Sequence, residues 1–341
     1  LSDVDPARFG RFPKARLRAR GQLSGHWLPQ LALHTRFELP DGTLEGRPLR
    51  GKGRFSYTQQ RLQDADIDLD LAGNLLVLKG GFGRPGNTLA WSINAPELSR
   101  LGLGFSGRLK SQGTLSGSLD QPQARFTADA QALRLPGIAK ADSLSARFNL
   151  QATANGVMEG SIAGQGLLLA GQAISSTRIT LTGRRSAHAM GIEARLPDWN
   201  GNARLQGGLN ASGLWRGQIL SLDVQGKWPV RLRAPAGLAL SRTSQHLQNA
   251  SLDVMGGRLD IAILDLQGEQ LRSQGSLSNL PLAPALDLMK APRPFTTDLR
   301  VAGGWNVRLG RTVDGFVRLR RVAGDVRMTD PVAQLGLQTL N

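Results

Sequence analysis

Apolar and polar residues alternate one by one along most of this chain, and no other feature constrains the fold as strongly. Successive side chains of a β-strand point to opposite faces, so a period of two is typical of a strand with one buried and one wet face. In residues 31–39, for example, Leu33 and Phe37 share one face, whereas His34 and Arg36 share the other. The apolar positions of the clearest stretches are Leu31, Leu33, Phe37, Leu69, Leu71, Leu89, Trp91, Phe148, Leu150, Ile179 and Leu181. The pattern predicts an all-β chain of half-buried strands.

Short turns and few helices complete the predicted secondary structure. Four Asp-Gly or Asn-Gly pairs match the two-residue hairpin turn, in which both central residues take a positive φ. These pairs are Asp41-Gly42, Asn155-Gly156, Asn200-Gly201 and Asp314-Gly315. Helical periodicity is confined to residues 5–12 and 283–290. We therefore expect mostly antiparallel strands joined by short connections.

A glycine-led segment recurs along the chain and is interpreted as a recurring strand start. It begins at Gly21, Gly113, Gly207 and Gly303, with intervals of 92, 94 and 96 residues. Proline-bearing segments with helix-start character stand upstream, at Pro6, Pro96, Pro197 and residues 281–284. A fixed period is typical of stacked structural units. We expect one continuous repeat array over residues 1–341, with units 1–94, 95–195, 196–280 and a truncated 281–341.

The number of strands limits the shapes that such an array can take. A chain of this length makes about 20 strands, and twisted open sheets rarely exceed ~10 strands without curling or folding over. Glycines within strands, such as Gly160 and Gly164, allow bulges and bends. A curled sheet with one apolar face encloses an apolar interior, as a closed barrel or as an open groove. The helix-punctuated repeat favours an open hydrophobic groove, because a groove can lengthen unit by unit.

Charge and composition narrow the range of partners. The net charge is +16, which favours nucleic acid, anionic lipid headgroups or acidic protein. Nucleic acid is disfavoured, because single-strand binders need exposed aromatics, whereas Trp91 falls on the apolar face and Tyr57 is the only tyrosine. The chain has no cysteine and no apolar run of 18 residues, so we expect no disulfide, membrane-spanning helix or signal peptide in this segment.

Motifs that would carry chemistry occur only as partial matches. Residues 81–86 read G-x-G-x-x-G, but a strand pattern follows where a nucleotide-binding loop needs a helix N-terminus. Asp66, Asp68 and Asp70 spell D-x-D-x-D, but Leu71 stands where a calcium loop needs glycine. The four histidines lack ligand spacing, and no catalytic carboxylate pair stands out. We expect a non-enzymatic chain without metal or cofactor.

Several stretches together resemble the TamB family of AsmA-like proteins. One is the opening at residues 5–9. A second is 113–130, where Ser118-Leu119-Asp120-Gln121-Pro122 ends one strand before the next begins. The others are 213–224 and 303–328. The resemblance extends over essentially the whole chain.

The resemblance implies an architecture and a cellular setting. TamB-like proteins fold as a β-taco, a long curled sheet whose hydrophobic groove spans the periplasm of Gram-negative bacteria. The family is linked to phospholipid transport between the inner and outer membranes, and to outer-membrane protein assembly with the barrel partner TamA. Its N-terminal inner-membrane helix and its C-terminal domain are not identifiable here. The resemblance therefore implies an interior, periplasmic section of a longer protein.

Two functions are compatible with these observations. In the first, phospholipid acyl chains lie on an apolar floor formed by the eleven residues from Leu31 to Leu181 named above, and rim arginines contact the headgroup. In the second, a stiff scaffold docks an outer-membrane barrel and offers sheet edges to client strands. A secreted β-solenoid adhesin fits less well, because the chain is strongly basic, has helical segments and lacks a short coil repeat.

Overall fold

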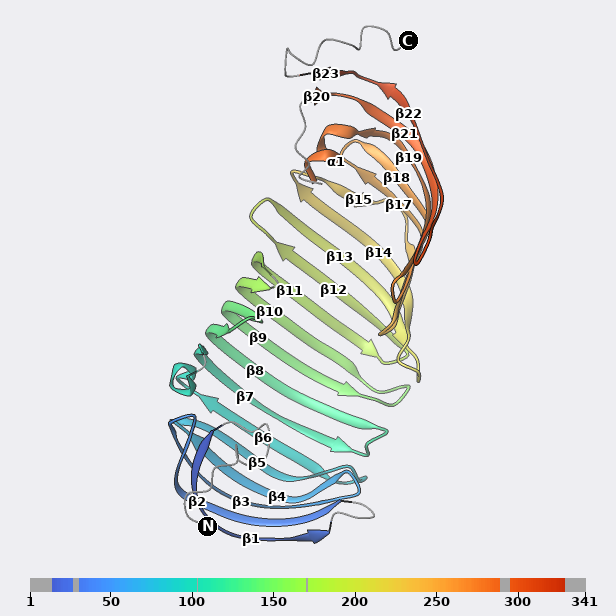
Figure 1. Cartoon of the computed structure of the whole chain (residues 1–341). Coiled ribbons are helices and arrows are strands. Elements are labelled where there is room, and N and C mark those ends of the chain that lie inside the picture. Colours follow the sequence, from blue (N-terminus) through green and yellow to red (C-terminus); the bar gives the residue numbers. More distant parts are fainter. Residues whose placement is uncertain (1–13, 27–30, 103, 170, 289–294, 329–341) are drawn as a thin grey trace. The chain divides into compact units, whose positions relative to one another are not determined.

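The computed structural model describes residues 14–26, 31–102, 104–169, 171–288 and 295–328, most of which are in β-strands (Figure 1). Twenty-one strands belong to one sheet, and β20 (Phe295–Thr297) and β23 (Val326–Met328) form a separate antiparallel pair. By its internal contacts the chain divides into two compact units. The first comprises residues 1–188 and 194–197, and the second comprises 189–193 and 198–341.

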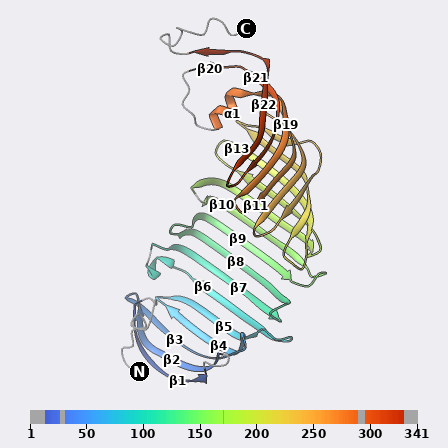
Figure 2. The ribbon, with the colours of Figure 1, turned by 45° about the vertical axis from the view of Figure 1, so that its right-hand side comes forward.

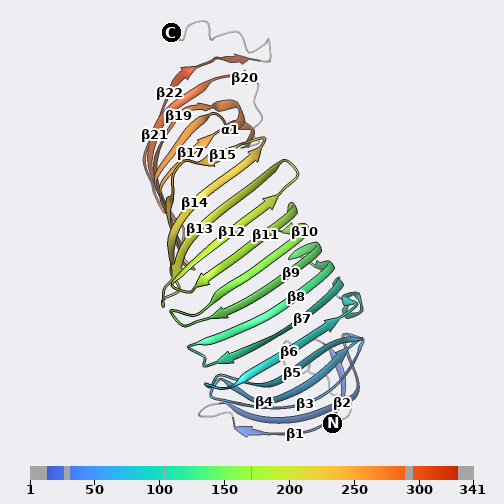
Figure 3. The ribbon, with the colours of Figure 1, turned by 180° about the vertical axis from the view of Figure 1, so that it is seen from behind.

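The first unit is an antiparallel meander in which each strand from β1 to β11 pairs with the next along the chain. Its strands are β1 (Ala15–His26), β2 (Ala32–Leu44), β3 (Arg47–Thr58), β4 (Arg61–Leu71), β5 (Asn74–Phe82), β6 (Thr88–Ala95), β7 (Ser106–Gly117), β8 (Pro122–Leu135), β9 (Ala139–Gln151), β10 (Met158–Leu169) and β11 (Gln172–Arg184). A short 3-10 helix, η2 (Leu98–Leu101), stands between β6 and β7. Figures 1 and 3 show that β1 to β5 are bowed. Residues of β12 (Ala187–Arg195) belong to both units.

The second unit continues the meander with one broken strand. Its strands are β13 (Trp199–Leu209), β14 (Trp215–Gly226), β15 (Val230–Leu232), β16 (Ala236–Leu240), β17 (Ser244–Val254), β18 (Gly257–Gln267), β19 (Gln270–Pro281), β21 (Arg300–Leu309) and β22 (Val313–Ala323). Both β15 and β16 pair with β14 on one side and with β17 on the other, so together they take the place of a single strand. Figure 2 shows the arched strands of this unit, with α1 (Leu282–Leu288) at their ends.

The prediction of an all-β fold built on a long curled antiparallel sheet, with a few short helices, is confirmed. Curling has a local cause in the first unit, where the strand register shifts at several points, for example between Arg54 and Ser56 and between Leu62 and Ala65. Asp64 lies within the second of these shifts and has a φ of 49°. An extra residue in one strand bends that strand and increases its twist.

Three of the four predicted turn pairs are wrong. Asp41-Gly42 lies within β2, Asn200-Gly201 within β13 and Asp314-Gly315 within β22. Only Asn155-Gly156 lies in a connection, between β9 and β10. The register of the apolar face overrides turn propensity here, because slipping a strand by one residue would move every side chain to the other face. Asp41 instead extends β2 and pairs with Arg18 of β1.

The observed tight turns use pairs that the sequence signal did not single out. They are Glu45-Gly46, Gln59-Gln60, Ala72-Gly73 and Met255-Gly256, and all eight residues have a positive φ. Positive φ at both central positions matches the twist of the flanking strands in a two-residue hairpin. These turns follow the hairpin rule for backbone conformation but not its usual residue preference.

The recurring glycines lie inside strands, so their interpretation as strand starts is wrong. Gly21, Gly113, Gly207 and Gly303 lie within β1, β7, β13 and β21. At each of them an added Cβ would overlap the carbonyl oxygen of an arginine in the next strand. Glycine therefore permits close approach of two strands, rather than beginning one. With β15 and β16 counted as one, six strand steps of the meander separate successive glycines, while the division into repeat units stays a prediction.

The predicted helices are partly confirmed. The segment 283–290 overlaps α1, and the segment at Pro96 leads into η2. The segment at Pro197 forms no helix, because only residues 196–198 separate β12 from β13. The predicted helix 5–12 lies outside the described residues. No helix of the described segments is long and apolar enough to cross a membrane.

Candidate functional site

One face of the first unit carries an unbroken cross-strand row of apolar residues and glycines. Residues that pair directly across two strands point to the same face of a sheet. From β1 to β11 the paired residues are Gly21, Phe37, Gly53, Ile67, Leu78, Trp91, Gly113, Phe126, Phe148, Gly160 and Leu181. The only polar side-chain group in this central apolar row is the indole N–H of Trp91, which donates to Ser111 Oγ at 3.3 Å.

A second row lies beside the central one on the same face. Its members, from β2 to β11, are Leu39, Gly51, Leu69, Leu76, Ile93, Ser111, Ala128, Ala146, Ile162 and Ile179. Ser111 is its only polar member, and its hydroxyl accepts the Trp91 hydrogen bond. Because side chains two residues apart on a strand share a face, the two rows form one continuous apolar strip.

Aromatic rings lie over glycines of neighbouring strands in the central apolar row. A Cβ at Gly113 would lie 2.6 Å from both the Arg125 carbonyl oxygen and Phe126 Cβ, and it would also meet the Trp91 ring. Phe148 covers Gly160 in the same way. The ring centroids of Trp91 and Phe126 are 6.1 Å apart and those of Phe126 and Phe148 are 5.3 Å apart, within the range of favourable aromatic pairs. Glycine thus makes room for bulky rings on the sheet.

The apolar face is only partly covered. All the non-glycine residues of the central apolar row are half-buried. In the described part of the chain no large side chain is fully buried, whereas a closed core places many large apolar side chains out of contact with water. Half-burial is expected when neighbours on one face shield each side chain but no second layer lies on top.

A small hydrophobic cluster forms where η2 packs against this face. Leu98 of η2 is 7% exposed, and it lies with Ala130, Leu133, Ala141 and Leu167 of β8, β9 and β10. Ala130 and Ala128 are two residues apart on β8, so the cluster adjoins the second row near the strand ends. η2 therefore covers one margin of the apolar face and leaves the central apolar row half-exposed.

The structure places ten of the eleven sequence-predicted residues in strands, on this face of the first unit. Leu33 and Phe37 are in β2, Leu69 and Leu71 in β4, Leu89 and Trp91 in β6, Phe148 and Leu150 in β9, Ile179 and Leu181 in β11, and Leu31 directly precedes β2. All eleven are half-buried. The two-residue spacing within each strand brings its members to the same side. Their role as a lining for lipid stays a prediction.

Sequence reasoning missed part of the same face. Leu76 and Leu78 of β5 escaped notice because their neighbours Leu75 and Val77 are also apolar, which hides the alternation. Phe126 stands in the alternating stretch 124–130, so this pattern could have identified it. The alternation does not identify the glycines of the central apolar row. Their contribution is to make room for a large ring, and this depends on which residue of the neighbouring strand lies opposite.

The other face of the first unit carries charged cross-strand pairs. Arg54 pairs with Asp66, Lys52 with Asp68 and Arg50 with Asp70. Opposite charges at such positions stabilise a sheet by roughly 0.2–1 kcal/mol per pair. The D-x-D-x-D pattern is therefore one face of a strand opposite a basic strand. Within the described residues, no three His, Asp or Glu side chains are grouped to hold a metal ion.

The second unit has an apolar face with shorter rows. Ala250, Ile261, Gly275, Trp305 and Val317 pair in turn across β17, β18, β19, β21 and β22. Trp305 lies over Gly275 and donates from its indole N–H to Ser273 Oγ at 2.8 Å. This repeats the geometry of the first unit, where Trp91 covers a glycine and donates to the serine two residues before it.

One family model matches most of this chain. The family model described as "TamB, N-terminal domain" matches residues 1–251, about three quarters of the chain. No curated protein and no solved structure matches the chain. The matched segment contains both apolar rows of the first unit and all eleven predicted residues. The chain belongs to the TamB family.

Proposed function

We propose that this chain is part of a non-catalytic conduit that carries phospholipid, with the acyl chains on the apolar face and the headgroup in water. The observation that carries the proposal is the central apolar row, which crosses eleven strands without a charged side chain. Each acyl CH₂ kept from water is worth ~0.8 kcal/mol. A lipid that shifts from strand to strand therefore needs an apolar contact at every step.

The length of the central apolar row supports movement rather than a single fixed site. Ten strand spacings of about 4.8 Å give roughly 50 Å along the sheet. One leaflet of a bilayer contributes about half of a hydrocarbon core of ~30 Å. The row is therefore about three times as long as an acyl chain, and its half-exposed side chains leave the face accessible.

The cellular setting that we propose follows from family membership. The chain would lie in the periplasm, between the inner and outer membranes. TamA would be the outer-membrane barrel partner.

Leu69→Arg tests the conduit. Leu69 belongs to the second row and lies against Gly51 of the neighbouring strand, so a guanidinium there would interrupt the apolar strip. We expect phospholipid to co-purify with the unmodified chain, as measured by native mass spectrometry, and to be strongly reduced in Leu69→Arg.

Ser92→Arg is the matched control, because it adds the same charge to the exposed polar face of β6. It should keep its lipid. Circular dichroism establishes that both variants retain the β-sheet. A folded Leu69→Arg chain that carries as much lipid as the control would contradict the proposal.

A structural scaffold in outer-membrane protein assembly is the second candidate, favoured by the edge of β22. Within the described residues β22 pairs only with β21, and Val313, Val317 and Leu319 on it are 79%, 63% and 58% exposed. An apolar edge strand is a template for strand addition by a client. This function predicts that Leu69→Arg leaves assembly of outer-membrane proteins unchanged, while proline at Val317 impairs it.

A further inference from the structure

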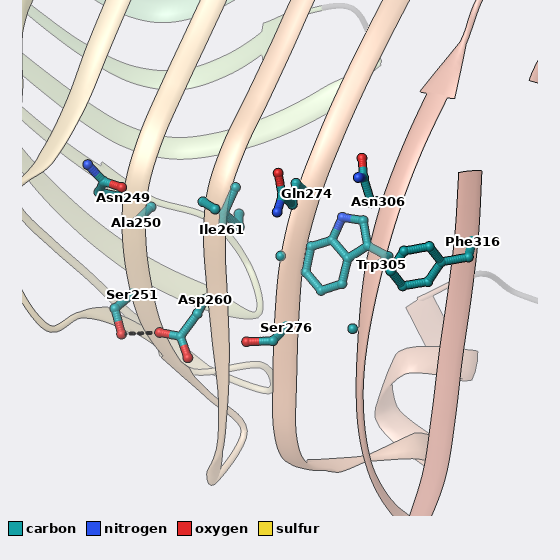
Figure 4. Close-up of a pocket in the computed structure, with 13 residues that line it drawn as sticks. Asn249, Ala250, Ser251, Asp260, Ile261, Gln274, Ser276, Trp305, Asn306 and Phe316 are labelled. Atoms are coloured by element: carbon teal, nitrogen blue, oxygen red, sulfur yellow. Dashed lines mark hydrogen bonds between the residues drawn. The ribbon is translucent and has the colours of Figure 1, made fainter. Parts of the chain in front are cut away.

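A polar hollow in the second unit is lined by the residues drawn in Figure 4. Its polar side chains alternate along the strands with the apolar row Ala250, Ile261, Gly275 and Trp305, so they lie on the opposite face of the sheet. The volume of the hollow is about 740 Å³, and it crosses β17, β18, β19, β21 and β22. One wall follows the cross-strand row Ser251, Asp260, Ser276 and Gly304. The other wall includes the row Gln274, Asn306 and Phe316. The floor between them is the backbone around Gly275 and Trp305, and the Trp305 side chain lies on the apolar face, over Gly275.

Local irregularities create the hollow. Gly304 stands in the first wall but has no side chain, which opens a gap beside Ser276. On β17, Asn249 takes a φ of 55°, a conformation that asparagine tolerates better than most residues. On β18, the register with β19 shifts between Ile261 and Ile263. Bulges re-aim side chains and are common beside functional sites.

The lining is unusual for this chain because it contains no Lys, Arg or His, although the whole protein carries a net charge of +16. Ser251 Oγ donates to Asp260 Oδ1 at 2.5 Å, as the dashed line in Figure 4 shows. This bond holds the carboxylate at the hollow and leaves Asp260 Oδ2 free to accept. A phosphate or another anion within these walls would meet a carboxylate and no cation of the lining.

Hydrogen-bonding capacity is left over in this lining. Within the described residues, the side-chain amides of Asn249, Gln274 and Asn306 and the hydroxyl of Ser276 make no hydrogen bond. Each amide offers both donors and an acceptor. Groups that donate and accept at close spacing match vicinal hydroxyls, which also do both. An acyl chain would leave all of these groups unpaired, so the phospholipid proposed for the apolar face is disfavoured as a ligand of this hollow.

An aromatic ring closes one end of the hollow. Phe316 is 46% exposed, and the Arg318 guanidinium lies over its ring at 4.7 Å from the centroid. This cation–π contact restrains the ring, which offers an apolar surface beside the polar walls (Figure 4). A sugar ring combines hydroxyl edges with a C–H face, so it can contact both surfaces at once. We propose that this hollow binds a neutral carbohydrate.

Saturation-transfer difference NMR with the whole 341-residue chain tests the proposal. The probes are the trisaccharide of N-acetylglucosamine and maltotriose, each at millimolar concentration. We expect transfer to the ring protons of at least one sugar. Asn306→Ala and Phe316→Ala should each weaken binding roughly tenfold. Asn306→Ala removes an amide that can both donate and accept hydrogen bonds, and Phe316→Ala removes the apolar contact with the sugar ring.

A matched serine pair provides the control. Ser276→Ala should weaken binding, whereas Ser278→Ala should leave it unchanged, because Ser278 lies on the same face of β19 but outside the hollow. The proposal would be overturned if neither sugar showed saturation transfer from the protein. Undiminished binding in Asn306→Ala would also overturn it, as would displacement of the sugar by inorganic phosphate or by an extended peptide. Asp260→Asn retains the side-chain shape and should also weaken binding.

Discussion

At the scale of single residues, this protein builds an apolar surface from few aromatics by setting Trp305 and the large rings of the central apolar row opposite glycines. Trp91 lies over Gly113 and Trp305 over Gly275, in different units of the chain. In both cases the indole N–H is satisfied by a serine, which removes the cost of an unpaired donor on an apolar face. The glycines are therefore packing partners of the rings and not only sites of flexibility.

Gly113→Ala tests this packing. Its Cβ would lie 2.6 Å from the Arg125 carbonyl oxygen and against the Trp91 ring, and overpacking of this kind typically costs 1–3 kcal/mol. We expect faster hydrogen exchange of the β6–β8 amides. In Gly201→Ala, the nearest atoms lie 3.5 Å from the new Cβ, so exchange near β13 should change little. Equal effects of the two substitutions would rule out the packing role.

At the scale of strands and turns, alternation in the sequence determines which face a residue takes, but not where each strand ends. The residues 31–39 alternate as predicted and lie in and beside β2, yet β2 extends to Leu44, past the predicted turn at Asp41-Gly42. The turn falls at Glu45-Gly46, so that β2 pairs with both β1 and β3 as far as Leu44. Turn propensity depends on two or three residues, whereas the register of a strand determines the burial of all its apolar side chains, so the register prevails.

The turn between β3 and β4 tests whether register imposes an unfavourable backbone conformation on turn residues. Gln60 has a φ of 61°, and left-handed backbone costs a residue with a side chain roughly 1–2 kcal/mol relative to glycine. Gln60→Gly should therefore slow hydrogen exchange in the β3–β4 hairpin. Thr58→Gly, at the end of β3, should speed exchange, because glycine weakens a strand by roughly 0.5–1 kcal/mol. The same sign for both changes would show that the turn is not strained.

At the scale of the whole molecule, the sequence was sufficient to predict the fold class and one side of the sheet, but not the order of residues across strands. Ten of the eleven predicted residues share a face because the period of two is a local property of each strand. The central apolar row depends on register, which joins residues from eleven strands. The polar hollow depends on a bulge near Ala262 and on Gly304 lying opposite Ser276. Neither feature can be inferred from any one segment of the sequence.

Contact between acyl chains and the apolar face is tested most directly by site-specific photo-crosslinking in cells that produce the full-length protein. p-Benzoylphenylalanine replaces Phe148 or Ile179 on the apolar face, and in matched controls it replaces their neighbours Arg147 or Arg178, which are exposed on the other face. We predict cross-linked phospholipid at positions 148 and 179 and none at 147 and 178. Equal labelling at all four positions, or labelling of the arginine positions alone, would contradict a lipid path on the apolar face.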